Sequence, residues 1–84
     1  MNIEITARHF DLTPELREHV ENEIKRLTKY FDNIISSEAI LDVEKYRQSA
    51  EIKIRVYKEV ITAKSDSDDM YASIEMAIDK IKAQ

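Results

Sequence analysis

The chain has 84 residues, enough for one small domain, and it contains neither cysteine nor glycine. The lack of cysteine excludes disulfides and thiolate chemistry, and the lack of glycine excludes glycine-rich phosphate-binding loops. The formal net charge of −4 disfavours nucleic-acid binding unless the basic residues gather on one face. No apolar run approaches the roughly 18 residues that a membrane span requires, so we expect a soluble, cytoplasmic domain with no membrane partner.

The chain begins with an alternating segment that is followed by a capped helix. Met1–Arg8 places apolar side chains at every second position, which predicts a half-buried strand. Thr13 offers an N-cap oxygen, and Pro14 suits the first helical position. Apolar residues then recur at helical spacing, which predicts a helix over Pro14–Tyr30. These apolar residues are Leu16, Val20, Ile24, Leu27 and Phe31.

Three further segments alternate apolar and polar residues and are joined by short polar stretches. They predict strands over Glu38–Tyr46, Ala50–Tyr57 and Val60–Ser65, with hairpin turns at Arg47–Ser49 and Lys58–Glu59. Such short connections make consecutive strands antiparallel neighbours. Because glycine is absent, we expect type I turns, which need no left-handed backbone.

The segment Asp68–Ile81 predicts a second amphipathic helix, and the polar residues 65–68 are expected to supply its N-cap. The element order is then β-α-β-β-β-α, and the helical connection allows the first strand to lie parallel to the second. Every element has a single apolar face. We therefore predict an α+β fold with a four-stranded sheet, both helices packed on one face, and the other face in water.

No combination of residues indicates catalysis or metal binding. His9 and His19 are the only histidines, and they fit neither a catalytic triad nor a zinc-binding spacing. The carboxylates lie at helix starts or beside lysines, where capping and solvation account for them. Asp66, Asp68 and Asp69 resemble part of a calcium loop but lack its glycine and its terminal glutamate. We expect no enzyme activity, cofactor, metal or small-molecule substrate.

The basic side chains are the one positive indication of a binding function. On a helical wheel, Lys25 and Lys29 lie opposite the apolar stripe of the first helix, with Arg26 at its flank. The second helix carries Lys80 and Lys82 near its end. Lysines at a helix C-terminus also complement the helix dipole. From the residues alone, a solvated surface and a phosphate-binding patch both stay open.

Four stretches of the chain resemble the ribosome hibernation-promoting factors, also called the ribosome-associated inhibitor or sigma-54 modulation family. They are NIEITAR (residues 2–8), LTPELREHVENEIKRLTKYFD (12–32), LDVEK (41–45) and DDMYASIEMAIDKI (68–81). The D-M-Y-A-x-I run is the most specific of these. The resemblance implies the same β-α-β-β-β-α order, similar to a double-stranded-RNA-binding domain, and no enzyme activity.

The resemblance also implies a partner, the small ribosomal subunit with its ribosomal RNA. Family members bind in the mRNA and tRNA channel over the decoding and peptidyl sites, block tRNA binding, and promote ribosome hibernation in stationary phase or stress. DNA is not an expected partner. By position, Arg26 matches a family lysine, and Lys29 and Lys80 match commonly basic positions. The residues expected to bind ribosomal RNA are Arg26, Lys29, Lys80, Lys25, Lys82, Arg8 and Arg17.

Two features depart from the family. Its members continue with a basic extension of the last helix, whereas this sequence stops at Gln84, so we expect the single domain of residues 1–84 to be followed by a basic tail or a second domain. The turn between the third and fourth strands often contains glycine in the family, where this chain has Lys58–Glu59. The alternative is a protein-interaction module that uses a strand edge or the open sheet face and has no affinity for ribosomal RNA.

Overall fold

The computed structural model describes residues 2–84; Met1, which the alternation assigned to the first strand, lies outside the described residues. The element order is the predicted β-α-β-β-β-α. The elements are β1 (Asn2–Arg8), α1 (Pro14–Arg26) with a 3-10 turn η1 (Leu27–Lys29), β2 (Ser36–Glu44), β3 (Arg47–Val56), β4 (Glu59–Ser67) and α2 (Met70–Lys82). The sheet has the order β1-β2-β3-β4, in which β1 and β2 are parallel and the other pairs antiparallel.

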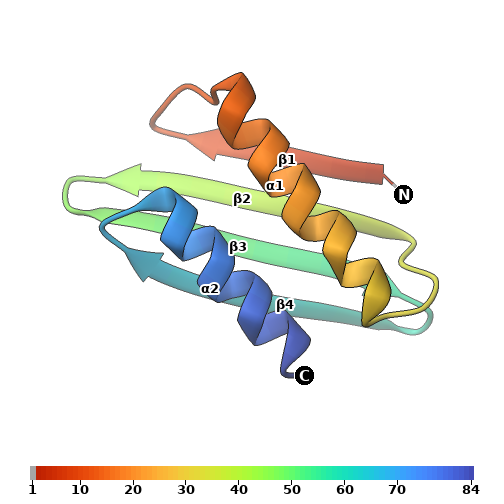
Figure 1. Cartoon of the computed structure of the whole chain (residues 1–84). Coiled ribbons are helices and arrows are strands. Elements are labelled where there is room, and N and C mark those ends of the chain that lie inside the picture. Colours follow the sequence, from red (N-terminus) through yellow and green to blue (C-terminus); the bar gives the residue numbers. More distant parts are fainter. Residues whose placement is uncertain (1) are drawn as a thin grey trace.

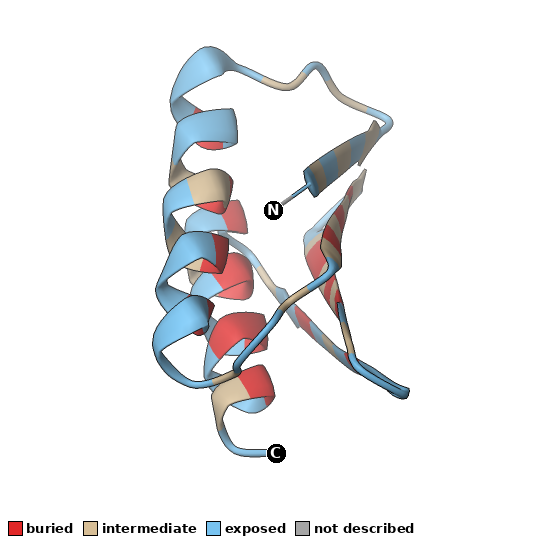
Figure 2. Ribbon diagram, turned by 90° about the vertical axis from the view of Figure 1, so that its right-hand side faces the viewer, coloured by how far each residue is buried: buried red, intermediate tan, exposed pale blue. Residues whose placement is uncertain are grey.

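The domain has two layers. Both helices cover one face of the sheet (Figure 1), and the buried residues gather between the helices and that face (Figure 2). The core is built from the inward positions of the strands and from the apolar stripes of both helices, as the two periodicities require. Its largest fully buried side chains include Ile24, Leu27, Leu41, Ile52, Ile54, Ile74, Ile78 and Ile81. The predicted α+β fold, with both helices on one face, is confirmed.

Side-chain oxygens cap the N-termini of both helices, and a serine hydroxyl joins α2 to the sheet. Thr13 Oγ1 accepts a hydrogen bond from the backbone amide three residues later at 3.1 Å. Asp69 Oδ2 does the same for α2 at 3.3 Å, so the N-cap is Asp69 and not one of residues 65–68. One turn further on, the fully buried hydroxyl of Ser73 donates to the carbonyl oxygen of Gln48 on β3 at 2.6 Å. This bond fixes the start of α2 against the sheet.

Several predicted boundaries are wrong because pairing between strands sets them. Residues 36 and 37 already pair with both neighbouring strands, so β2 begins at Ser36. Arg47–Ser49 pair with residues 42–44, and the first hairpin turn therefore lies at Lys45–Tyr46. Residues 65–67 pair with β3, which extends β4 to Ser67. Alternation identified the facing of the apolar strand residues correctly, but it carries no information on how far a ladder runs, and it placed the buried Ser37 and Ser49 in turns.

The end of the first helix also differs from its predicted end. The regular α-helix stops at Arg26, and the expected last turn is the tighter η1. Within it, the Thr28 hydroxyl donates to the carbonyl oxygen of Lys25 at 2.7 Å, and the Tyr30 amide donates to that of Leu27 at 2.9 Å. These bonds satisfy carbonyl groups that a helix end otherwise leaves to water.

The expectation of type I hairpin turns is wrong. Lys45 has φ 37° in the β2–β3 turn, and Lys58 has φ 64° in the β3–β4 turn, which lies at Tyr57–Lys58. Short hairpin loops favour left-handed backbone because it matches the right-handed twist of the strands. A residue with a Cβ atom pays roughly 1–2 kcal/mol for this conformation. Lysine therefore occupies two positions where glycine would fit without strain.

We expect Lys58→Gly to raise the free energy of unfolding by roughly 0.5–1 kcal/mol, because removal of the Cβ atom relieves this strain at a smaller cost in unfolded-state entropy. Urea denaturation followed by circular dichroism measures the change. Glu59→Gly, one residue later in β4, is the matched control and should destabilise the domain, since glycine weakens a strand. A lower urea midpoint for Lys58→Gly would contradict the expectation.

Candidate nucleic-acid interface

The C-terminal ends of the two helices lie at the same end of the molecule. Both helices cross the sheet in the same direction, so their last turns are neighbours (Figure 1). Lys82 Nζ lies 5.1 Å from the centroid of the Tyr30 ring, which joins the end of α2 to the residue after η1. Five of the seven predicted RNA-binding residues lie in these last turns and in η1. We call them the helix-end cluster: Lys25, Arg26, Lys29, Lys80 and Lys82.

The α1 side of the helix-end cluster is available to a partner. Lys25, Arg26 and Lys29 are all exposed. Arg26 Nη1 lies 3.2 Å from Glu23 Oε2, one helical turn before it. The Glu23 side chain is only 12% exposed, whereas that of Arg26 is 66% exposed. The Arg26 guanidinium has five N–H donors, so it can hold Glu23 and still offer donors to a phosphate.

Lys80 has a second role that sequence reasoning missed. Its Nζ donates to the carbonyl oxygen of Lys64 at 2.8 Å, and Gln84 Nε2 donates to that of Thr62 at 3.0 Å. Both carbonyls belong to β4, an edge strand of the sheet. An edge strand offers unpaired backbone groups to other chains, and these two side chains occupy part of that edge. The Lys80 ammonium keeps further donors for an anion.

Arg8 and Arg17, the other two predicted RNA-binding residues, are not brought into the helix-end cluster. Arg8 ends β1, where Asp42 of β2 is its register partner. Arg17 lies in the first half of α1, next to Glu18. Both side chains are exposed, but each lies beside an acidic residue and away from the helix ends.

Charge is distributed unevenly between the two ends of the helix layer. The helix-end cluster occupies one end. The opposite end holds the start of both helices and the end of β4 (Figure 1). Acidic side chains gather there: Asp11, Glu15, Glu18, Asp66, Asp68 and Asp69. A chain with a net charge of −4 can thus still present a basic end to a polyanion.

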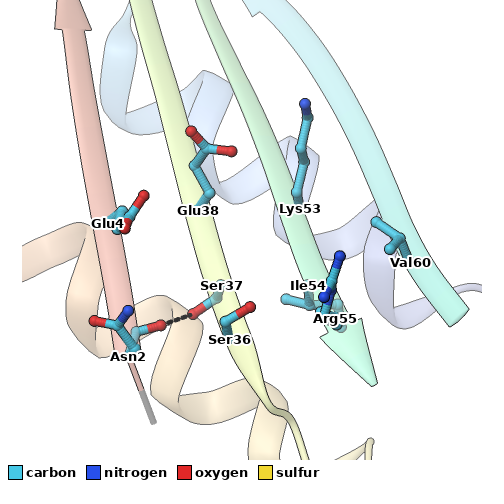
Figure 3. Close-up of a pocket in the computed structure, with 9 residues that line it drawn as sticks. All are labelled: Asn2, Glu4, Ser36, Ser37, Glu38, Lys53, Ile54, Arg55 and Val60. Atoms are coloured by element: carbon cyan, nitrogen blue, oxygen red, sulfur yellow. Dashed lines mark hydrogen bonds between the residues drawn. The ribbon is translucent and has the colours of Figure 1, made fainter. Parts of the chain in front are cut away.

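The open face of the sheet carries both charges in alternation. Glu38 is the register partner of Lys53, and Glu51 is that of Lys64. Opposite charges that face each other across strands largely neutralise one another. A shallow depression of about 300 Å³ at one end of this face shows the same mixture, with Glu4 and Glu38 beside Lys53 and Arg55 (Figure 3). This face is a poorer phosphate surface than the helix ends.

Within residues 2–84, no group of three or more His, Asp or Glu side chains is arranged to hold a metal ion. Neither α1 nor α2 is both long and apolar enough to cross a membrane. His9 Nδ1 instead lies 2.8 Å from Asp42 Oδ1 near the sheet, and His19 packs edge-on against the Tyr71 ring.

The fold and the basic helix ends define a small α+β domain with a candidate polyanion-binding end, and comparisons with known proteins identify its family. The family model described as "Sigma 54 modulation protein / S30EA ribosomal protein" matches residues 3–84. The ribosome hibernation promoting factor of Azotobacter vinelandii is 37% identical over the whole chain and 78% of its own length. That of Escherichia coli K12 is 34% identical, with 88% of its length covered. The chain belongs to the Sigma 54 modulation protein / S30EA ribosomal protein family, and the resemblance read from the sequence is confirmed.

Solved structures of similar proteins have the same fold. A ribosomal subunit interface protein from Coxiella burnetii superposes with a TM-score of 0.92 at 27% identity, covering this whole chain and 92% of the other. The N-terminal domain of Thermus thermophilus Protein Y gives a TM-score of 0.92 at 27% identity, with 94% of that chain covered. The shared architecture therefore extends over all the elements described above.

Proposed function

We propose that this chain binds the small ribosomal subunit, blocks translation, and so acts as a ribosome hibernation factor in the cytoplasm during stationary phase or stress. The observation that carries the proposal is the helix-end cluster, in which two helices place five basic side chains at one end of an acidic domain. The names of its relatives, ribosome hibernation promoting factor and ribosomal subunit interface protein, support the same function.

The proposed mechanism is steric and needs no chemistry. Exposed lysine and arginine side chains bind the phosphates of ribosomal RNA, which is recognised by shape and backbone more than by base sequence. The domain measures 37 × 23 × 18 Å and has a packed core, so it can act as a rigid obstacle. Placed in the mRNA and tRNA channel, over the decoding and peptidyl sites, it would exclude tRNA. No catalytic role is assigned to any residue.

Co-sedimentation with purified small subunits tests the proposal. We expect binding at low salt that weakens steeply as salt rises, because each phosphate contact releases counterions. We also expect the bound protein to lower the amount of tRNA retained by the same subunits on a filter. A protein-interaction module would instead show no affinity for small subunits and salt-insensitive association with a protein. Absence of binding at low salt would refute the proposal.

A further inference from the structure

The two hairpin turns of the sheet share an unusual composition. The β2–β3 turn is Lys45–Tyr46, and the β3–β4 turn is Tyr57–Lys58. Both tyrosines are almost fully exposed, at 91% for Tyr46 and 75% for Tyr57. Both lysines have left-handed backbone, so strain does not distinguish the turns. The turns lie at opposite ends of the sheet (Figure 1), and their surroundings are different.

The β3–β4 turn lies at the end of the domain where the helix-end cluster is found. The Ile35 amide, in the segment after η1, donates to the carbonyl oxygen of Arg55 at 2.7 Å and joins that segment to the end of β3. On the other side, the bond from Gln84 to Thr62 holds the end of α2 against β4. Figure 2 looks onto this end, with the helices in one layer and the sheet in the other. The turn and the helix ends thus lie at the same end of the domain, the turn in the sheet layer and the cluster in the helix layer.

The side chains around the β3–β4 turn suit an unpaired nucleotide. Lys58 Nζ lies 5.3 Å from the centroid of the exposed Tyr57 ring. A hollow of about 310 Å³ beside the turn is lined by Ile35, Arg55, Val56, Lys58, Glu59 and Val60. Two of these residues are basic, one is acidic and three are apolar. An exposed aromatic ring next to basic groups is the usual platform for single-stranded RNA, because every base can stack on it.

The β2–β3 turn has the same tyrosine and lysine but lies at the acidic end. The hollow beside it is lined by Glu44, Lys45, Tyr46 and Arg47. Arg47 Nε is 3.9 Å from Asp66 Oδ2, so part of its charge is already matched within the domain. This turn therefore provides an internal control, with equal composition and different surroundings.

We propose that the β3–β4 turn is a second RNA contact of this domain, at which Tyr57 stacks on an unpaired base while Lys58 and Arg55 bind neighbouring phosphates. The inference rests on the proposed function and specifies its RNA partner further: the helix-end cluster binds backbone phosphates, and the turn binds a single-stranded segment beside them. The turn thereby limits binding to places where paired RNA and an unstacked base lie side by side.

Affinity for purified small subunits, measured at one salt concentration for matched variants, tests the inference. Tyr57→Leu keeps apolar bulk but removes the stacking ring and should weaken binding roughly 5- to 150-fold, the range observed for loss of one base–aromatic stack. Tyr57→Phe should bind like the wild type. Tyr46→Leu, the control in the β2–β3 turn, should also leave affinity unchanged.

Lys58→Gly separates binding from folding. We expect this variant to be more stable than the wild type and yet to bind small subunits more weakly, with a slope of log affinity against log salt that is smaller by about one. A variant that merely damaged the fold would not show both effects. Lys58→Asn, which also tolerates left-handed backbone, should weaken binding in the same way.

Each contrary outcome identifies what is wrong. If the wild-type protein binds and Tyr57→Leu binds equally well, the proposed contact at the β3–β4 turn is wrong, while the proposed function stands. Equal losses in Tyr57→Leu and Tyr46→Leu would also overturn it. If Tyr57→Leu binds normally while Tyr57→Ala does not, the turn makes an apolar contact with protein and not a stack on RNA. Wild-type protein that fails to bind small subunits at all would refute both proposals.

Discussion

Reversal of charge by Arg26→Glu together with Lys29→Glu is expected to abolish most of the salt-sensitive binding to small ribosomal subunits. Both side chains are exposed and outside the core, so the fold should be retained. If each contacts one phosphate, the slope of log affinity against log salt falls by about two. When the salt concentration rises from about 50 to about 200 mM, the affinity of the wild type should then fall by a factor roughly ten times larger than the factor for the variant. Sedimentation at several salt concentrations measures both slopes.

The matched control places the same change of charge at the other end of the domain. Lys45→Glu with Arg47→Glu alters the net charge equally, but in the β2–β3 turn and the first residue of β3, where acidic residues are already gathered. A local contact predicts a large loss only for the change in the helix-end cluster. Similar losses for the two double variants would show that the overall charge of the protein governs the interaction, and the helix-end cluster would lose its assigned role.

Ile78→Ala is expected to have the largest effect on stability. Ile78 is only 1% exposed and lies on the apolar stripe of α2, above the sheet. Truncation of a buried isoleucine removes its transfer free energy and leaves a cavity, at a cost of about 2–5 kcal/mol. Domains of this size have total stabilities of roughly 4–12 kcal/mol. The variant should therefore be partly unfolded at 37 °C or close to it.

Urea denaturation of Ile78→Ala beside Met76→Ala provides the measurement and its control. Met76 lies on the same helix but is 44% exposed, so its truncation should change the free energy of unfolding by less than about 0.5 kcal/mol. The slope of the free energy against urea should stay constant if only stability changes. Equal effects at the two positions would mean that the α2 stripe does not pack on the sheet as described.

The candidate site was only partly predictable from the sequence. A helical wheel identifies Lys25 and Lys29 as solvent-facing because that fact depends on their own helix alone. It cannot show that Lys82 lies over the Tyr30 ring, since this depends on the direction in which the two helices cross the sheet. The hydrogen bond from Lys80 to the Lys64 carbonyl could not be predicted from the sequence for the same reason. The Tyr57 ring carried no signal, because an exposed aromatic in a turn resembles any other turn residue.

By itself the sequence determined the kind and order of the elements and the face that each residue presents. Those properties follow from periodicities of two and 3.6 and from capping residues such as Thr13, all of which act within a few residues. Tertiary structure decided the rest. Strand pairing set where β2 and β4 end, and sheet twist placed Lys45 and Lys58 in left-handed backbone. The parallel passage of α1 and α2 gathered the basic residues at one end, because contacts between distant segments depend on how whole elements pack.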